Sequence, residues 1–254
     1  MLALTREVPR SIADGERTHV PRTPIDLARA RAEHGRYLAA LEELGCEVRP
    51  LPEEPDLPDS VFVEDTAIVL DEVAVIARPG ADSRRAETSS VAEALSGLRP
   101  LVTIAEPATL DGGDVLVLGR RVFVGGSSRT DAAGATALAT LVEPFGYTVE
   151  VVPLTDCLHL KSAACAVGPD TVLVNPAWVD PSLLAVERVI EVDPREAFAA
   201  NAVLVRDAVI HPEGFPRTRA RLEAAGIRVV SVPAAELARA EGGVTCCSLL
   251  LRRS

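Results

Sequence analysis

A repeated pattern of helix, glycine and strand places the strongest constraint on the fold of this chain. A glycine, two further residues and an extended run ending in proline occur three times, as GCEVRPLP (45–52), GYTVEVVP (146–153) and GIRVVSVP (226–233). Each copy follows a stretch with apolar residues at helical spacing. Such a stretch followed by glycine is typical of a helix, its C-cap and a strand.

A second repeat predicts hairpins. Two β-like runs flank a short polar turn in TAIVLDEVAVIARPG, DVLVLGRRVFVGG, AACAVGPDTVLVNP and NAVLVRDAVIHPEG. GVTCCSLLLRR begins like a fifth hairpin, for which MLALTREVP at the N-terminus supplies the partner strand. The five predicted hairpins begin roughly 40 to 50 residues apart, and this regular spacing indicates a circular repeat architecture. We therefore predict an α/β fold with five ββαβ-like units about a pseudo-fivefold axis, forming one domain over residues 1–254.

Composition excludes several classes of function. The net charge of −11 argues against nucleic-acid and anionic-membrane partners, which attract basic surfaces, and is compatible with a cationic ligand. Aromatic residues make up only 3%, too few for base-stacking platforms. The five cysteines are an odd number, and the N-terminus lacks an apolar signal core, so we expect a cytoplasmic protein with reduced thiols. No C-x-x-C pair is present, and we expect no metal and no cofactor.

Polar residues precede most of the predicted hairpins. They lie in DSVFVED (59–65), TLDGGD (109–114), CLHLKS (157–162) and GGVTCCS (242–248). The segment before the fourth hairpin, AFAAN, has no charged residue, histidine or cysteine. In a ring of equivalent units these segments converge at one end of the axis. A thiol, a histidine and carboxylates brought together there suit nucleophilic catalysis, and additional acids suit a cationic substrate such as a guanidinium.

Six motifs in register identify a resemblance. LPDSVFVEDTA, ARPGADSRR, TLDGGDVL, SSRT, LHLKSA and GGVTCCS, spread from about residue 20 to 251, resemble the dimethylarginine dimethylaminohydrolase family of the pentein, or guanidino-group modifying, superfamily. The resemblance implies a five-bladed α/β propeller. It also implies hydrolysis of Nω-methylated arginines to citrulline and methylamine or dimethylamine, through a covalent thiouronium intermediate and without a cofactor.

The resemblance also implies roles for individual residues. Cys247 is the implied nucleophile, His159 the general acid and base, and Asp111 the carboxylate that orients His159. Asp65, with Glu64 beside it, grips the guanidinium, Asp59 and the position of Glu241 meet the α-ammonium, and Arg84 and Arg129 meet the α-carboxylate. Cys246 is then a bystander whose side chain points away from Cys247, as expected if the segment is extended.

Two positions separate this chain from its relatives. Glu16 lies in a predicted N-terminal flap where the family often has leucine, so it is a substrate-contact candidate that bears on closure and substrate choice. Lys161 stands where arginine deiminases carry an acid that grips an unmethylated guanidinium, which favours a methylated substrate. The alternatives are an arginine deiminase or other guanidine hydrolase and, in a different class, a non-catalytic binder of cationic amino acids. The expected partner is a small cationic amino acid, and the expected assembly is a monomer or homodimer.

Overall fold

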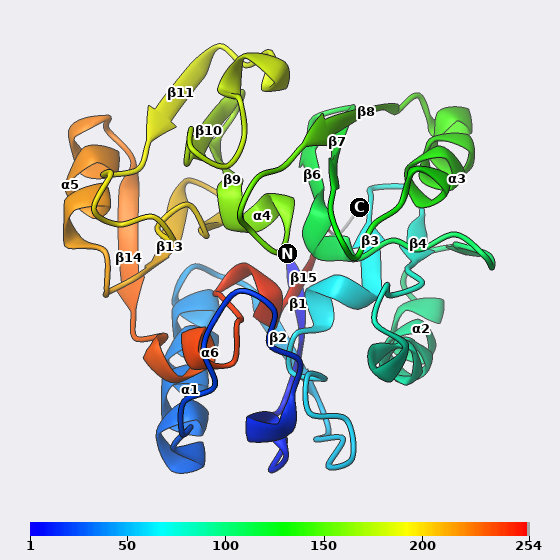
Figure 1. The fold of residues 1–254 in the computed structure, drawn as a ribbon, viewed down its shortest axis with the longest axis horizontal. Helices are drawn as coiled ribbons and strands as arrows, with labels where there is room; N and C mark the ends of the chain where they lie inside the picture. The colour runs from blue at the N-terminus through cyan, green and yellow to red at the C-terminus, as the bar shows by residue number, and fades with distance from the viewer. Residues whose placement is uncertain (253–254) are drawn as a thin grey trace.

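The chain, seen in a computed structural model that describes residues 1–252, forms five three-stranded sheets arranged in a ring (Figure 1). In every sheet the first and middle strands are antiparallel and the middle and last strands are parallel. In that order the sheets are β15 (Leu249–Leu251), β1 (Leu2–Arg6) and β2 (Glu47–Leu51); β3 (Ala67–Val69), β4 (Ala74–Ile76) and β5 (Leu101–Thr103); β6 (Val115–Leu118), β7 (Arg121–Gly126) and β8 (Thr148–Pro153); β9 (Ala164–Gly168), β10 (Thr171–Val174) and β11 (Arg188–Glu191); β12 (Val203–Val205), β13 (Ala208–Pro212) and β14 (Arg228–Val232). The predicted five-unit α/β ring is therefore confirmed.

Helices connect the middle strand of a unit to its last strand. They are α1 (Leu27–Glu43), α2 (Thr88–Ser96), α3 (Ala132–Val142) and α5 (Pro216–Ala224), and they lie toward the outside of the ring (Figure 1). Asp26 and Asp131 cap α1 and α3, because their side chains accept backbone N–H groups of the first turn. The unit of β9 to β11 has only a short 3-10 helix at Pro181–Leu184.

The glycines of the three copies of the first repeat, predicted to cap helices, adopt the left-handed conformation. Gly45, Gly146 and Gly226 have φ angles of 80°, 79° and 82°. Glycine has no Cβ to clash in this region, so it ends the helix and turns the chain into the strand. The pattern therefore located β2, β8 and β14 correctly.

The apolar core lies between neighbouring units of the ring. One cluster joins Tyr37 and Leu41 of α1 to Val205 and Ile210 of the adjoining unit, and four further clusters join the other neighbours. Within residues 1–252, no helix has both the length and the apolar character needed to cross a membrane. All five cysteines are unpaired.

The first strands of all five units surround a central cavity of about 270 Å³. Residues of β15, β3, β6, β9 and β12 line it, together with Glu64 and Lys161 at one end. The ring thus places the residues that precede the inner strands around the same end of the axis, where the candidate site lies.

Candidate active site

Short helical turns precede four of the five inner strands and supply the polar groups of the site. They are η2 (Val63–Thr66), η4 (Gly112–Asp114), α4 (Leu160–Ala163) and η7 (Thr245–Cys247). Asp65 and Cys246 from these turns and His159, the residue before α4, line one narrow crevice, together with Asp59, Arg84 and Arg129. We refer to this space as the crevice. Residues from distant parts of the chain therefore meet where the unit repeat predicted.

His159 lies between two carboxylates. Its Nε2 is 3.1 Å from Asp111 Oδ2, and its Nδ1 is 3.8 Å from Asp65 Oδ1. Burial alone lowers the pKa of His159, but Asp65, Asp114 and Asp111 outweigh burial and raise the pKa to about 9. The imidazole is therefore protonated at neutral pH and has a proton to donate.

The Gly-Gly pair of the DGGD segment allows this approach. A Cβ on Gly113 would lie 2.5 Å from Asp65 Oδ1 and 2.7 Å from His159 Nδ1, closer than real Cβ contacts permit. The Gly113 amide instead donates to Asp65 Oδ1 at 3.0 Å. Burial acts to raise the pKa of Asp65, but His159 and Arg84 prevail and lower it, so Asp65 is ionised.

Asp114, the second acid of the segment, positions the histidine loop. Its Oδ1 accepts the Leu160 amide at 3.0 Å, and its Oδ2 accepts the hydroxyls of Ser127 and Thr130. Burial raises the pKa of Asp114 to about 6. The two acids thus have different roles. Asp111 contacts the imidazole, and Asp114 fixes the backbone that carries it.

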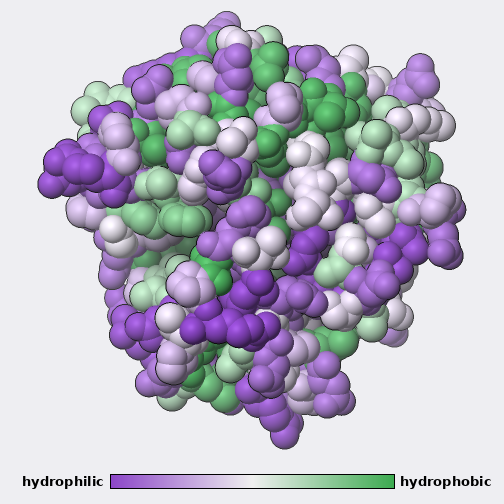
Figure 2. Space-filling view, viewed as in Figure 1, coloured by the Kyte–Doolittle hydropathy of each residue, from purple (hydrophilic) through white to green (hydrophobic). Residues whose placement is uncertain are grey.

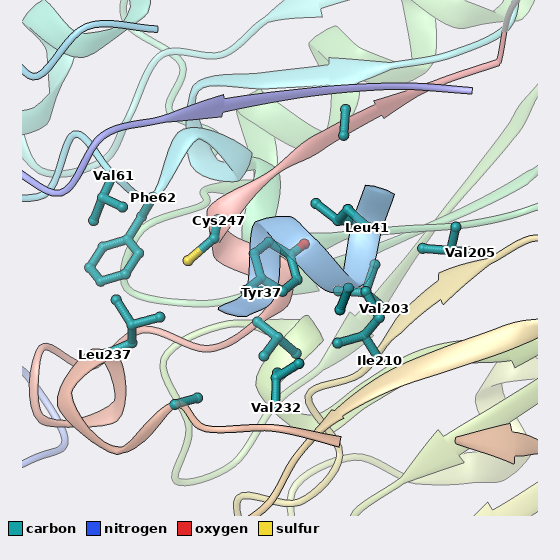
Figure 3. Packing of buried hydrophobic residues seen from close by; sticks show 14 of the residues in the cluster. Tyr37, Leu41, Val61, Phe62, Val203, Val205, Ile210, Val232, Leu237 and Cys247 are labelled. Atoms are coloured by element: carbon teal, nitrogen blue, oxygen red, sulfur yellow. The ribbon is translucent and has the colours of Figure 1, made fainter. Parts of the chain in front are cut away.

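The two adjacent cysteines face different environments, and they do so in the opposite sense to the prediction. Cys247 is 0% exposed and belongs to the apolar cluster that contains Tyr37, Phe62 and Leu237. Figure 3 shows its sulfur directed among these side chains. Cys246 is partly exposed and lines the crevice with His159. The expectation that Cys247 faces the site while Cys246 points away is therefore wrong.

The local backbone explains the reversal. Residues 245–247 form a 3-10 turn rather than the extended segment that the prediction assumed. The Gly243 amide donates to Cys246 Sγ at 3.3 Å, and the Cys247 thiol donates to the Gly243 carbonyl at 3.5 Å. Burial, followed by Glu64 and Asp65, raises the pKa of Cys246. Its resting form at neutral pH is the neutral thiol.

Two arginines border the crevice, but their surroundings differ. Arg84 is ion-paired with Asp65 at 2.5 Å and Glu87 at 2.8 Å, and it also donates to the carbonyls of Asp59 and Phe62. Arg129 contacts Thr18 Oγ1 at 3.3 Å and has no acidic partner among residues 1–252. The predicted pairing of Arg84 with a substrate carboxylate is therefore at odds with its present contacts, whereas Arg129 is free to form one.

Glu64 and Lys161 lie outside the crevice. Glu64 Oε1 is 2.7 Å from Lys161 Nζ, and the pair borders the central cavity. Burial raises the pKa of Glu64, and for Lys161 the attraction of Glu64 outweighs burial and raises the pKa. The structure does not bring Glu64 to the predicted substrate contact, because its carboxylate is turned toward Lys161. Lys161 likewise does not line the crevice.

A loop near the N-terminus covers the crevice, and we refer to residues 15–20 as the N-terminal loop. Asp59 Oδ2 accepts the Glu16 amide at 2.9 Å, and the Glu16 carboxylate accepts the Ser83 hydroxyl at 2.6 Å. The Glu241 carboxylate accepts the Thr18 and His19 amides at 2.5 and 2.6 Å. Strongly hydrophilic side chains cover the part of the face that this loop crosses (Figure 2). Asp59, Glu16 and Glu241 are thus joined through the loop.

A second, larger cavity borders several of the same residues. This lateral cavity has a volume of about 470 Å³ and shares His159, Cys246 and Glu241 with the crevice. The crevice itself has about 20 Å³, so a ligand larger than a single water requires the covering N-terminal loop to move. Asp65, Asp111 and His159 also offer ligand atoms within 4.8 Å of one another, a spacing that a metal ion tolerates.

Comparison with known proteins agrees with this arrangement. The arginine deiminase family profile matches residues 53–202. The chain is 41% identical to a dimethylarginine dimethylaminohydrolase of Streptomyces coelicolor, over 98% of this chain and 96% of the relative. It is 35% identical to the Pseudomonas aeruginosa enzyme of that name, over 97% of each chain. The chain belongs to the dimethylarginine dimethylaminohydrolase family.

Solved structures extend the comparison within this family. A cysteine-to-serine mutant of the Pseudomonas aeruginosa dimethylarginine dimethylaminohydrolase, complexed with citrulline, superposes with a TM-score of 0.92 at 34% identity, covering 97% of both chains. The pentein fold implied by the sequence motifs is therefore confirmed.

Sequence reasoning missed one residue that joins units of this dimethylarginine dimethylaminohydrolase-family fold. Asn201 lies at the start of the fourth predicted hairpin, where the sequence offered no candidate site residue. It donates to Thr245 Oγ1 at 2.8 Å and to the Lys161 carbonyl at 3.3 Å. Its Oδ1 accepts the Thr245 amide at 3.1 Å. Asn201 thus fixes the turn that carries Cys246. Its place at the start of that hairpin was the available signal.

Proposed function

We propose that the chain is a cysteine hydrolase that converts Nω-methylated arginines to citrulline and methylamine or dimethylamine. The observation that carries the proposal is that Cys246 and the protonated His159 line the same acid-lined crevice. A nucleophile, a proton donor and a carboxylate for a cation are the groups that this hydrolysis needs. Membership of the family supports the same substrate class.

Cys246 is the nucleophile in this proposal, in place of Cys247. Its thiol is neutral in the free protein, so it must give up its proton to solvent when the substrate binds, because His159 is already protonated. A bound guanidinium places a positive charge beside the sulfur and favours the thiolate. The thiolate then attacks the guanidinium carbon and forms a C–S bond.

His159 acts first as a general acid and then as a general base. Its imidazolium gives a proton to the departing nitrogen as the C–N bond breaks, which leaves a thiouronium on Cys246 and a neutral imidazole. That imidazole takes a proton from water, and the resulting hydroxide adds to the thiouronium carbon. The C–S bond breaks, the thiolate leaves, and citrulline is released after losing one proton. Asp111 holds His159 in place through the 3.1 Å contact.

The remaining residues bind the substrate. Asp65 accepts guanidinium N–H groups, and Arg129 pairs with the α-carboxylate, because its guanidinium has no acid partner among the described residues. Asp59 and Glu241 place negative charge near the α-ammonium. We further propose a cytoplasmic protein in which residues 1–254 form one catalytic domain.

The test compares three substrates. We would incubate the protein with asymmetric dimethylarginine, monomethylarginine and arginine, and quantify citrulline together with the released amine. Citrulline from the methylated substrates, with little from arginine and none from the Cys246→Ser variant, is the expected result. Citrulline mainly from arginine identifies a deiminase instead, and binding of all three without citrulline identifies a non-catalytic binder.

A further inference from the structure

The lateral cavity has no role in the mechanism so far, although it borders both groups that react. His159 and Cys246 lie in its wall, together with Asn201 and Gly243. Its volume of about 470 Å³ is within the range of pockets that hold drug-sized ligands. The methyl groups of a methylarginine fill only a small part of such a space.

The wall of the lateral cavity away from the catalytic groups is mainly apolar. Three segments supply it, and they are the loop before β12, the connection from β13 to α5, and the start of α6 (Ala235–Arg239). Their apolar members include Phe198, Pro212, Phe215, Pro233, Ala234 and Ala238. Phe198 is 50% exposed, one of few large apolar side chains with such exposure.

Several charged side chains in the same wall already form ion pairs or hydrogen bonds with other residues of the chain. Arg29 is ion-paired with Glu33 at 2.9 Å, and Glu33 also accepts the Glu236 amide at 2.8 Å. Glu241 is engaged by the N-terminal loop. Because these charges are already paired, they favour a neutral, apolar occupant of the cavity over a further charged group.

The position of the cavity relative to His159 determines which part of a substrate reaches it. The departing nitrogen must lie next to His159, because that residue gives it a proton. An alkylated nitrogen has fewer N–H groups to offer to Asp65 than the unsubstituted nitrogens of the guanidinium, so we expect the unsubstituted nitrogens to face the carboxylates and the alkylated one to face away from them. His159 also lies in the wall of the lateral cavity, which is the larger space next to it.

We propose that the lateral cavity is a subsite for the alkyl substituents of the departing nitrogen, and that it accepts groups much larger than methyl. The substrate class is therefore Nω-alkylated arginines, with chains such as butyl, rather than methylarginines alone. This inference rests on the proposed hydrolysis at Cys246. For Nω-butylarginine the same bonds form and break, and the products are citrulline and butylamine.

The first experiment compares Nω-butylarginine with monomethylarginine and identifies the products by mass spectrometry. We expect citrulline and butylamine, with a kcat/KM within tenfold of that for monomethylarginine. Release of ammonia with formation of Nω-butylcitrulline overturns the proposal, because the butyl-bearing nitrogen would then lie away from His159. A kcat/KM more than tenfold lower overturns it as well.

A filled cavity provides the second test. Gly214 lines the cavity, and a Cβ there meets nothing within 4 Å, so Gly214→Phe adds bulk without a clash at the Cβ. We expect at least a tenfold loss of kcat/KM for butylarginine and less than a threefold change for monomethylarginine. Gly97→Phe, at an equally open position outside this cavity, is the matched control. Equal losses for both substrates overturn the proposal, and Ala238→Phe repeats the test if the first variant does not fold.

Binding separates this proposal from the proposed hydrolysis. In the Cys246→Ser variant, calorimetry measures the Kd of both arginines without turnover. A Kd for butylarginine within tenfold of that for monomethylarginine supports the subsite even if no methylarginine is hydrolysed, which would overturn only the proposed function. Binding of monomethylarginine with a more than tenfold weaker Kd for butylarginine overturns the subsite alone.

Discussion

At the scale of single residues, the cysteine pair gives the most direct prediction. Cys246→Ser should lower kcat by on the order of 10³-fold or more, because the nucleophile is lost. Cys247→Ala should keep kcat within about threefold, because its sulfur packs in the apolar core, and should lower the free energy of unfolding by about 1–2 kcal/mol. Citrulline assays and urea unfolding measure these effects. The reverse pattern of activity would return the nucleophile to Cys247.

The protonation of Cys246 gives a second prediction. Burial, Glu64 and Asp65 raise the pKa of this thiol, so the thiolate fraction of the free protein grows about tenfold per pH unit below that pKa. Alkylation by iodoacetamide, followed by mass spectrometry of the Cys246 peptide, should therefore accelerate continuously from pH 7 to pH 9. A plateau below pH 8 would contradict a raised pKa.

The site residues show what a sequence can predict at this scale. Asp65, Asp111 and His159 were predictable because each lies within a few residues before an inner strand, and the ring brings those positions together. The orientation of neighbouring cysteines was not, because it depends on the 3-10 turn and on the Gly243 contacts. The predicted substrate contact of Glu64 was wrong for a similar reason. Glu64 and Asp65 are neighbours in a 3-10 turn, and there Asp65 faces the crevice whereas Glu64 faces Lys161.

At the scale of elements, the N-terminal loop depends on one carboxylate. Glu241 accepts two consecutive loop amides, and hydrogen bonds to a charged group contribute about 1.5–3 kcal/mol each. Glu241→Ala should therefore speed amide hydrogen exchange at Thr18 and His19 at least about tenfold, and should raise KM because the loop no longer closes over the crevice. Mass-spectrometric exchange and steady-state kinetics measure both.

The control for this loop is Glu42→Ala, which removes an exposed carboxylate of α1 that lines neither the crevice nor the lateral cavity. It should leave the exchange of the loop and the KM unchanged. Unchanged exchange in Glu241→Ala would mean that the loop is held by its other contacts, among them the bond from Glu16 to Asp59.

The elements themselves were largely predictable. The hairpins and the three glycine-terminated helices appear as expected, because period-2 alternation and a left-handed glycine are local signals. Strands β5 and β11 were not predicted. They lack the preceding glycine pattern, and β11 follows a short 3-10 helix in place of an amphipathic helix.

At the scale of the whole molecule, the ring closes through its two chain ends. Leu2 pairs with Leu251 and Leu4 with Leu249 in an antiparallel register, so the first and last strands share one sheet. Leu2, Leu4, Leu249 and Leu251 are buried in a cluster with residues of the next unit. The sequence predicted this pairing because the fifth hairpin lacked its second strand.

Closure of this kind predicts that the position of the chain ends is interchangeable among the units. A permutant that joins residue 254 to residue 1 by a short Gly-Ser linker, with new ends between Arg206 and Asp207 in an exposed turn, should fold and keep kcat/KM within about fivefold. Every strand pair and every site residue is preserved in it. Thermal unfolding and citrulline assays measure the outcome.

A second permutant separates the contribution of the ring to folding from the contribution of the site to activity. Opening the chain between Cys157 and Leu158 leaves all five sheets intact but frees the segment that carries His159. This permutant should fold cooperatively yet lose most of its activity, because the distance from His159 to Asp111 is then no longer fixed from both sides. If instead the first permutant failed to fold, the junction of β1 and β15 would differ from the other four units, and the pseudo-fivefold symmetry would not extend to the energetics of folding.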